Sequence, residues 1–170
     1  MIHVAILVED LYEDMELQYP LYRLQEEGFK VDIIGTEKGV EYKGKHGYPT
    51  KSGFASNEIK ADDYDAVVIP GGYSPDRMRR CPSTVEFVMQ MDRKKKLIAA
   101  ICHGPWMMAS CCNLRGKKVT GFFSIKDDLL NAGADFVDAE VVVCENLITS
   151  RTPADLIVFS KEIIKALKNR

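Results

Sequence analysis

The chain has 170 residues, of which 46% are hydrophobic and 28% are charged, and its formal net charge is −2. These values are typical of a soluble globular protein that can bury a core, and the simplest expectation is a single domain over residues 1–170. The slight acidity argues against a nucleic-acid-binding protein, which would present a basic face, and the short apolar runs argue against a membrane span.

Strand-like and helix-like segments alternate along the chain, because apolar runs alternate with apolar residues at helical spacing. The expected elements are a strand over 4–8, a helix over 13–27 that Pro20 should kink, a strand over 30–35, a hairpin or extended loop over 39–53, a strand over 66–69, a helix over 83–93, a strand over 97–101, a helix from 105, a strand over 118–120, a short helix over 125–131, strands over 139–144 and 147–149, and a final helix that Thr152 and Pro153 begin. Repeated β–α–β units predict an α/β fold with a doubly wound, largely parallel sheet between helices.

Three of the expected strands end in residues that can carry chemistry. Glu13 follows the first strand, Gly71 and Gly72 follow the strand over 66–69, and Cys102 follows the strand over 97–101. Ligands of such sheets bind at the carboxyl ends of the strands. These residues are therefore candidates for one shared site.

Cys102 is the strongest candidate for a nucleophile. Five apolar residues precede it, and His103, Gly104 and Pro105 follow, which fits a sharp turn from a strand into a helix. Unpaired amides and the positive end of the helix dipole favour a thiolate there, as in the nucleophile elbow of serine hydrolases. The alternative is a buried structural thiol.

A cysteine hydrolase also needs a proton carrier, and the chain has three histidines. His3 lies at the opposite edge of the expected sheet, and His46 fits a solvated loop. His103 is therefore the expected base, although a solvated residue at a helix start is the alternative.

Backbone amides near the thiol are candidates for an oxyanion hole. The turn at Gly71 and Gly72 can bring amides close to a bound carbonyl, and the His103 amide can point into the same oxyanion hole; the alternative for the glycines is a simple tight turn. Glu13 could donate a proton to the sulfur or fix its position, but the local sequence alone favours a surface acid at a helix start.

The sequence gives no reason to expect a metal or cofactor. No Cys/His pair has zinc spacing, no GxGxxG follows a strand, and there is no P-loop. The five cysteines form no CxxC motif, and residues 1–8 lack the features of a signal peptide. A reducing, cytoplasmic location is therefore expected.

Several motifs together resemble those of the PfpI intracellular protease and parkinsonism-associated deglycase family, which belongs to the class I glutamine amidotransferase-like superfamily. The most distinctive is the cysteine elbow over residues 100–105. The others lie at 13–17 with 19–20, 44–47, 70–72, 125–128, 131–133 and 150–156, so the resemblance covers nearly the whole chain.

The resemblance implies a flavodoxin-like fold and assigns roles around the sulfur. Cys102 would be the nucleophile, Glu13 would hydrogen-bond to its sulfur, and the amides of Gly72 and His103 would bind the oxyanion. In the family, a glutamate from a neighbouring subunit pairs with the histidine that follows the cysteine and completes the catalytic site.

Two positions depart from the family pattern. Asp76 stands where that glutamate is expected, and its side chain is one methylene shorter. Because the glutamate of the family comes from a neighbouring subunit, the resemblance implies a homo-oligomer in which Asp76 lies near His103. Phe122 and Phe123 stand where relatives often carry tyrosine or tryptophan before proline.

Members of this family are described as peptidases, as glutathione-independent glyoxalases and as deglycases of methylglyoxal or glyoxal adducts. All three activities need a thiolate that attacks a carbonyl carbon. The resemblance therefore implies a cysteine-dependent hydrolase of a small dicarbonyl, a glycated group or a peptide. The alternative is a non-catalytic redox-sensing or chaperone-like stress protein that uses the same cysteine.

Overall fold

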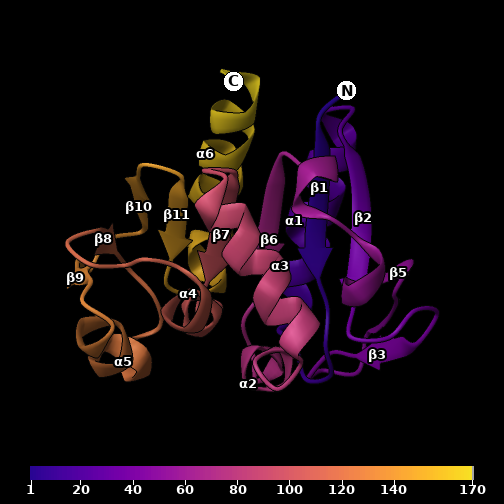
Figure 1. Cartoon of the computed structure of the whole chain (residues 1–170), viewed down its shortest axis with the longest axis horizontal. Coiled ribbons are helices and arrows are strands. Elements are labelled where there is room, and N and C mark those ends of the chain that lie inside the picture. Colours follow the sequence, from indigo (N-terminus) through magenta and orange to yellow (C-terminus); the bar gives the residue numbers. More distant parts are fainter. Residues whose placement is uncertain (170) are drawn as a thin grey trace.

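The computed structural model describes residues 1–169, which form a central seven-stranded sheet flanked by helices (Figure 1). Its strands are β1 (His3–Leu7), β2 (Lys30–Gly35), β5 (Phe54–Ala55), β6 (Ala66–Ile69), β7 (Leu97–Ile101), β10 (Val141–Cys144) and β11 (Leu147–Ser150). Their order is β10-β11-β7-β6-β1-β2-β5, and the neighbours run parallel except β10 and β11. The predicted doubly wound, largely parallel sheet is confirmed.

Six α-helices accompany the sheet in the described residues. They are α1 (Asp14–Glu26), α2 (Ser74–Met78), α3 (Pro82–Arg93), α4 (Pro105–Cys111), α5 (Lys126–Asn131) and α6 (Leu156–Lys168). None of the helices in residues 1–169 is long and apolar enough to cross a membrane.

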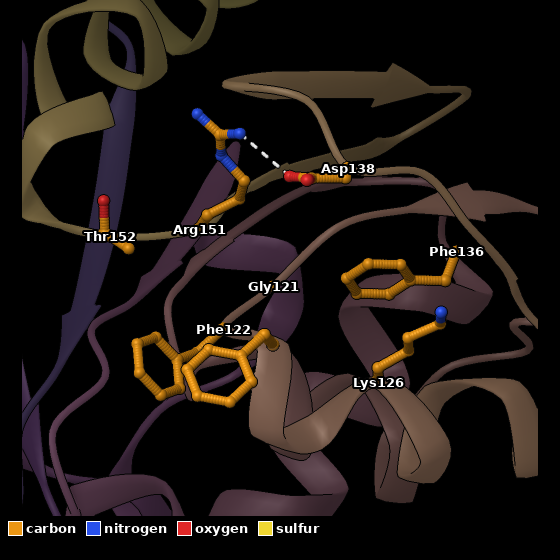
Figure 2. A pocket seen from close by; sticks show the side chains of 8 residues that line it. Gly121, Phe122, Lys126, Phe136, Asp138, Arg151 and Thr152 are labelled. Atoms are coloured by element: carbon orange, nitrogen blue, oxygen red, sulfur yellow. Dashed lines mark hydrogen bonds and ion pairs between the residues drawn. The ribbon is translucent and has the colours of Figure 1, made fainter.

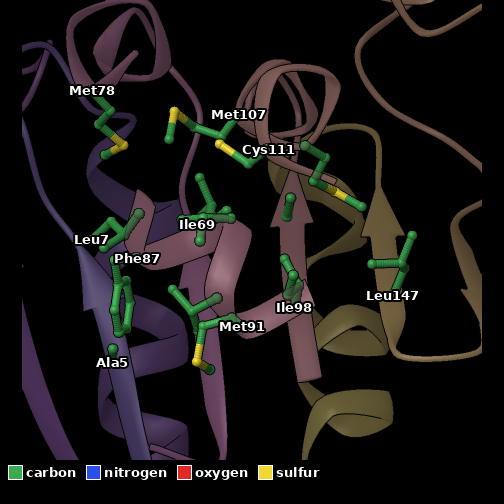
Figure 3. Close-up of a cluster of buried hydrophobic side chains, with 14 of the residues drawn as sticks. Ala5, Leu7, Ile69, Met78, Phe87, Met91, Ile98, Met107, Cys111 and Leu147 are labelled. Atoms are coloured by element: carbon green, nitrogen blue, oxygen red, sulfur yellow. The ribbon is translucent and has the colours of Figure 1, made fainter. Parts of the chain in front are cut away.

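The sheet is buried on both faces because its central strands carry apolar side chains at every position. Alternate residues point to opposite faces of a strand. One set, including Leu7, Ile69 and Ile98, packs with Phe87 of α3 and Met107 of α4 (Figure 3). The other set packs with residues of α1 and α6. This double burial explains why continuous apolar runs predicted the strands.

The smaller elements differ from the sequence predictions in places. The hairpin expected within 39–53 is present as β3 (Glu41–Lys43) and β4 (Pro49–Lys51). A short parallel pair, β8 (Lys118–Val119) and β9 (Asp135–Phe136), forms a separate two-stranded sheet. The short helix α2 and the two-residue strands β5 and β9 were not predicted, since each is too short to show periodicity.

Prolines lie at the entry to α6 and inside α1. Thr152 precedes a 3-10 turn over Pro153–Asp155, and α6 begins after that turn at Leu156. Pro20 lies inside α1, which continues to Glu26.

The order of the sheet places the predicted site residues at one edge. When the two-residue strand β5 is left out, the parallel strands β1, β2, β6, β7 and β11, numbered along the chain, have the spatial order 2-1-3-4-5, which reverses between β1 and β6. The segment after β1 bonds to the segment after β6, since the Tyr73 amide donates to the Leu11 carbonyl at 2.8 Å. β7 ends beside β6. The three predicted carboxyl ends therefore meet at the switch point of the sheet.

The turn after β7 leaves no room for a side chain at Gly104. A Cβ there would collide with the carbonyl oxygen of Ile69 and lie 2.8 Å from that of Ile101. We predict that Gly104→Ala lowers the free energy of unfolding by about 1–3 kcal/mol through overpacking, as measured by urea denaturation. At Gly53 the added Cβ would meet its nearest neighbour at 3.7 Å, so Gly53→Ala should change stability by less than about 1 kcal/mol. Equal stability of the two variants would contradict this packing.

Candidate active site

Cys102 lies on the turn between β7 and α4 in the left-handed region of backbone space, with φ of 62°. Residues other than glycine adopt this conformation rarely, and surrounding contacts must hold it. The Cys102 amide donates to the Ser150 carbonyl at 3.0 Å, and its own carbonyl accepts from the Phe122 amide at 2.8 Å. The predicted nucleophile elbow is therefore present.

Two backbone amides face the Cys102 sulfur, those of His103 and Gly72. Burial raises the pKa of the thiol, and the adjacent Glu16 carboxyl adds to this, whereas the two amides lower it; the balance is upward. The amides favour the thiolate, as predicted, but burial and Glu16 outweigh them, so the resting site holds a thiol. The thiol needs a nearby base to lose its proton.

The acid beside the sulfur is Glu16, in the first turn of α1, and not Glu13 as predicted. Glu16 is fully buried, and its Oε2 accepts the Gly71 amide at 2.7 Å. Burial raises the pKa of this carboxyl to about 8, and its interactions include one with the Cys102 thiol. At neutral pH Glu16 therefore keeps its proton.

One oxygen of the protonated Glu16 carboxyl makes no hydrogen bond within the described residues. Its Oε1 is buried without a hydrogen-bond partner among residues 1–169. An unpaired buried donor is costly, whereas a donor that meets a thiolate is stabilised. Glu16 is therefore suited to hold a proton toward the sulfur once the thiol is ionised.

Glu13 lines the same pocket as Cys102, but its carboxylate interacts with residues other than the thiol. Its Oε2 is 2.5 Å from Lys45 Nζ and 3.7 Å from His46 Nε2. Both partners come from the turn between β3 and β4. The hydrogen bond with Glu13 raises the pKa of Lys45. The sequence prediction missed Lys45, because only the fold brings the hairpin over the start of α1.

His103 lies against the nucleophile, as predicted for the base. Its Nδ1 is 3.5 Å from Cys102 Sγ, and its Nε2 is 3.3 Å from Ser124 Oγ. The ring stacks on Phe122 at a centroid distance of 5.0 Å and meets Trp106 edge-on at 5.2 Å.

The protonation state of His103 suits a base. Burial lowers the pKa of its imidazole, and the charge of Lys45 lowers it further. A neutral ring can accept the thiol proton at Nδ1 while its Nε2–H donates to Ser124. Ser124 was not predicted, because no local pattern marks a serine that reaches a histidine 21 positions away.

The other predicted residues take different places. Asp76 lies on α2, and its carboxylate pairs with Arg80 of the same chain. His3 lies at the amino edge of the sheet as expected, where its Nε2 is 2.7 Å from Asp32.

The assembled pocket has a volume of about 340 Å³. It is lined by Glu13, Glu16, Lys45, Gly72, Tyr73, Cys102, His103, Phe122 and Pro153. A thiol, a neutral imidazole, convergent amides and a protonated acid in one open pocket can attack a carbonyl carbon and stabilise the resulting oxyanion.

Glu13, Asp14 and His46 are close enough to offer ligand atoms within 4.8 Å of one another. The Asp14 oxygens, however, already accept the amides of His46 and Tyr48, and Glu13 pairs with Lys45. These protein donors occupy the positions that a metal would need, so we assign no metal to this cluster.

Cys81, which precedes α3, is the other cysteine with notable chemistry. Burial raises the pKa of its thiol, but hydrogen bonds with Ser83 and Thr84 outweigh burial and lower the pKa to about 7. Its sulfur lies 3.2 Å from Ser83 Oγ. Cys81 is therefore the thiol from which the reactivity of Cys102 must be distinguished in any labelling experiment.

Known proteins are similar to this chain in both sequence and fold. The family model described as the DJ-1/PfpI family matches residues 2–166. A deglycase of Pyrococcus abyssi is 46% identical, with 97% of this chain and 99% of that protein covered. The Bacillus subtilis protein YraA, whose name gives it as a candidate cysteine protease, is 45% identical over 97% of this chain and 98% of its own length.

One solved structure is also very similar. It is a two-domain protein from Anabaena variabilis that contains DJ-1/ThiJ/PfpI-like and ferritin-like domains. It matches with a TM-score of 0.97 and 46% identity, and the match covers 99% of this chain and 48% of that chain.

The raised pKa of Glu16 has a consequence for stability. The unfolded chain loses this proton at ordinary glutamate pH values, whereas the folded protein keeps it to a pH of about 8. The unfolded state therefore binds fewer protons between these values, and stability falls as the pH rises through this window. We predict that the loss in unfolding free energy between pH 5 and pH 8 is smaller in Glu16→Gln than in the unaltered protein by about 1 kcal/mol or more.

Urea denaturation at both pH values measures this loss. Glu86→Gln is the matched control, because Glu86 is exposed on α3 and its removal leaves Glu16 in place. The same loss in Glu16→Gln as in the control would show that Glu16 is ionised in the folded protein at pH 5.

Proposed function

The chain belongs to the DJ-1/PfpI family, and from that premise we propose that it is a cysteine-dependent hydrolase of electrophilic carbonyl compounds. Its preferred activity would be that of a glutathione-independent glyoxalase or deglycase, with peptide hydrolysis as a weaker capacity. The observation that carries the proposal is the 3.5 Å approach of His103 Nδ1 to Cys102 Sγ, at a sulfur that two backbone amides also face.

The first step is attack on the carbonyl carbon. His103 accepts the thiol proton at Nδ1, and the Cys102 sulfur adds to the aldehyde carbon of a dicarbonyl such as methylglyoxal. The carbonyl oxygen becomes the oxyanion of a hemithioacetal, within reach of the amides of Gly72 and His103 because both already point at the sulfur. Glu16, uncharged at neutral pH, adds no negative charge next to the forming adduct.

The second step moves a proton and releases the product. His103 first returns the thiol proton to the oxyanion, which gives the neutral hemithioacetal and a neutral imidazole. The imidazole then takes the proton of the former aldehyde carbon and delivers it to the neighbouring carbonyl carbon, while the hydroxyl proton passes from the first oxygen to the second, and the adduct becomes a thioester of lactate. Water then hydrolyses the thioester to lactate and restores the thiol. The net reaction adds one water to methylglyoxal and needs no cofactor.

A peptide bond is the harder substrate for this site. Its leaving amine must take a proton from an imidazolium in the transition state. Burial and Lys45 disfavour the charged form of His103, and its Nε2 faces the neutral hydroxyl of Ser124. These contacts support dicarbonyl turnover over proteolysis.

Assembly is a further part of the proposal. We propose a homo-oligomer in which Asp76 of a neighbouring subunit approaches His103. Support comes from the position of Asp76 on α2, directly after the Gly72 turn, and from the partial exposure of its carboxylate. In this arrangement Asp76 would have to leave Arg80 to reach the imidazole.

The nucleophile is tested by two serine substitutions. We predict that Cys102→Ser reduces Cys102-dependent formation of lactate from methylglyoxal by at least about 10³-fold, because a serine hydroxyl is far less acidic than a thiol. Cys81→Ser is the matched control, since Cys81 has the lowered pKa but lies outside the pocket, and it should retain turnover. Comparable turnover by Cys102→Ser would exclude Cys102, and loss of activity in Cys81→Ser alone would transfer the role to Cys81.

A further inference from the structure

A second cleft of about 440 Å³ opens beside the catalytic pocket, and the chemistry above makes no use of it. It is lined by Gly121, Phe122, Phe123, Lys126, Phe136, Asp138, Arg151 and Thr152. Figure 2 shows Lys126 and Phe136 together along one side of the cleft, with Arg151 and Asp138 joined across another.

The cleft adjoins the catalytic pocket, because Phe122 lines both. The Phe122 amide bonds to the Cys102 carbonyl, so this shared wall is fixed to the nucleophile itself. A second boundary runs between two successive residues, since Thr152 lines the cleft and Pro153 lines the catalytic pocket. The cleft is therefore the neighbouring space into which a substrate that is held at Cys102 and longer than a small dicarbonyl can extend past Phe122.

Three phenylalanines contribute aromatic rings to the walls of the cleft. The rings of Phe122 and Phe123 lie 4.7 Å apart at an angle of 42°, and Phe136 adds a third ring. The side chain of Phe123 is 77% exposed. An exposed phenylalanine in a concave site leaves apolar area that a ligand can cover.

One cation of the cleft is available to a ligand. Arg151 is already bound through Nε at 2.9 Å and Nη2 at 3.1 Å to the buried Asp155, and through Nη1 at 2.8 Å to Asp138. Lys126 instead places its ammonium 5.8 Å from the centre of the Phe136 ring. The ion pairs of residues 1–169 give Lys126 no carboxylate partner.

We propose that this cleft is a substrate subsite that takes an aromatic group carrying a carboxylate, as in a carbonyl adduct of an aromatic amino acid. This inference rests on the proposed function, because the ligand's carbonyl would react at Cys102. The ring would pack among the phenylalanines, and the carboxylate would pair with Lys126. Asp138 opposes a more highly charged group, so a single carboxylate fits better than a phosphate.

Binding without turnover tests the subsite. The protein is Cys102→Ser, labelled with ¹⁵N, and the probes are N-acetylphenylalanine, its amide and N-acetylalanine. The phenylalanine acid should shift the amide resonances of residues 121–126 and 136–138, and it should bind about two- to five-fold more tightly than the amide, as expected for one exposed ion pair. N-acetylalanine should bind more weakly than either phenylalanine probe.

Two variants assign the contacts. Lys126→Gln should abolish the preference for the acid over the amide, whereas Lys161→Gln, an exposed lysine on α6, should keep it. Phe123→Ala should weaken both phenylalanine probes, and its exposure makes it safe for folding. The subsite is overturned if the phenylalanine probes do not bind at these resonances, if acid and amide bind equally, or if Lys126→Gln keeps the preference. None of these results depends on turnover, so they are separate from the test of the nucleophile.

Discussion

The left-handed backbone at Cys102 is the constraint on which the rest of the site depends. An extended residue at the end of β7 would continue the alternation of a strand that is buried on both faces. The turn instead directs the sulfur to the edge of the sheet, where the Gly72 turn and the first turn of α1 meet it. This conformation costs about 1–2 kcal/mol, and hydrogen bonds with Ser150 and Phe122 hold it in place. The nucleophile is therefore positioned by four segments that are distant in sequence, and not by its own helix alone.

Electrostatics then decide where the protons reside. A charged Glu16 beside a thiolate would place two negative charges in a buried space, and burial prevents this by raising the pKa values of both groups. The opposite shift operates at His103, whose pKa burial and Lys45 lower. At neutral pH the resting site therefore holds a thiol, a neutral imidazole and a neutral acid. The thiolate is formed in place when a carbonyl compound arrives, and the amides that face the sulfur are already oriented for the negative charge.

The sequence was sufficient for the parts of this arrangement that depend on local patterns. Apolar runs predicted the central strands, and the Gly104-Pro105 sequel predicted the elbow, because a buried strand and a helix start each leave a local signature. The choice of acid failed, since Glu13 and Glu16 both open α1. The phase of the helix does not distinguish them, since Glu16 lies four residues before the buried Pro20 and Glu13 lies four residues before the buried Leu17. Lys45 and Ser124 had no such signature, because long-range packing alone brings them to the site.

The protonation of Glu16 is the most direct test of this account, and the infrared difference spectrum between the unaltered protein and Glu16→Gln measures it. The account predicts the carbonyl stretch of a protonated carboxylic acid at pH 6, which disappears as the pH rises through about 8. In a Cys102→Ser background the frequency of that band should change, because the neighbouring atom is no longer sulfur. A carboxylate band for Glu16 at pH 6 would contradict the account, since a charged acid at this position would oppose the thiolate that it is proposed to stabilise.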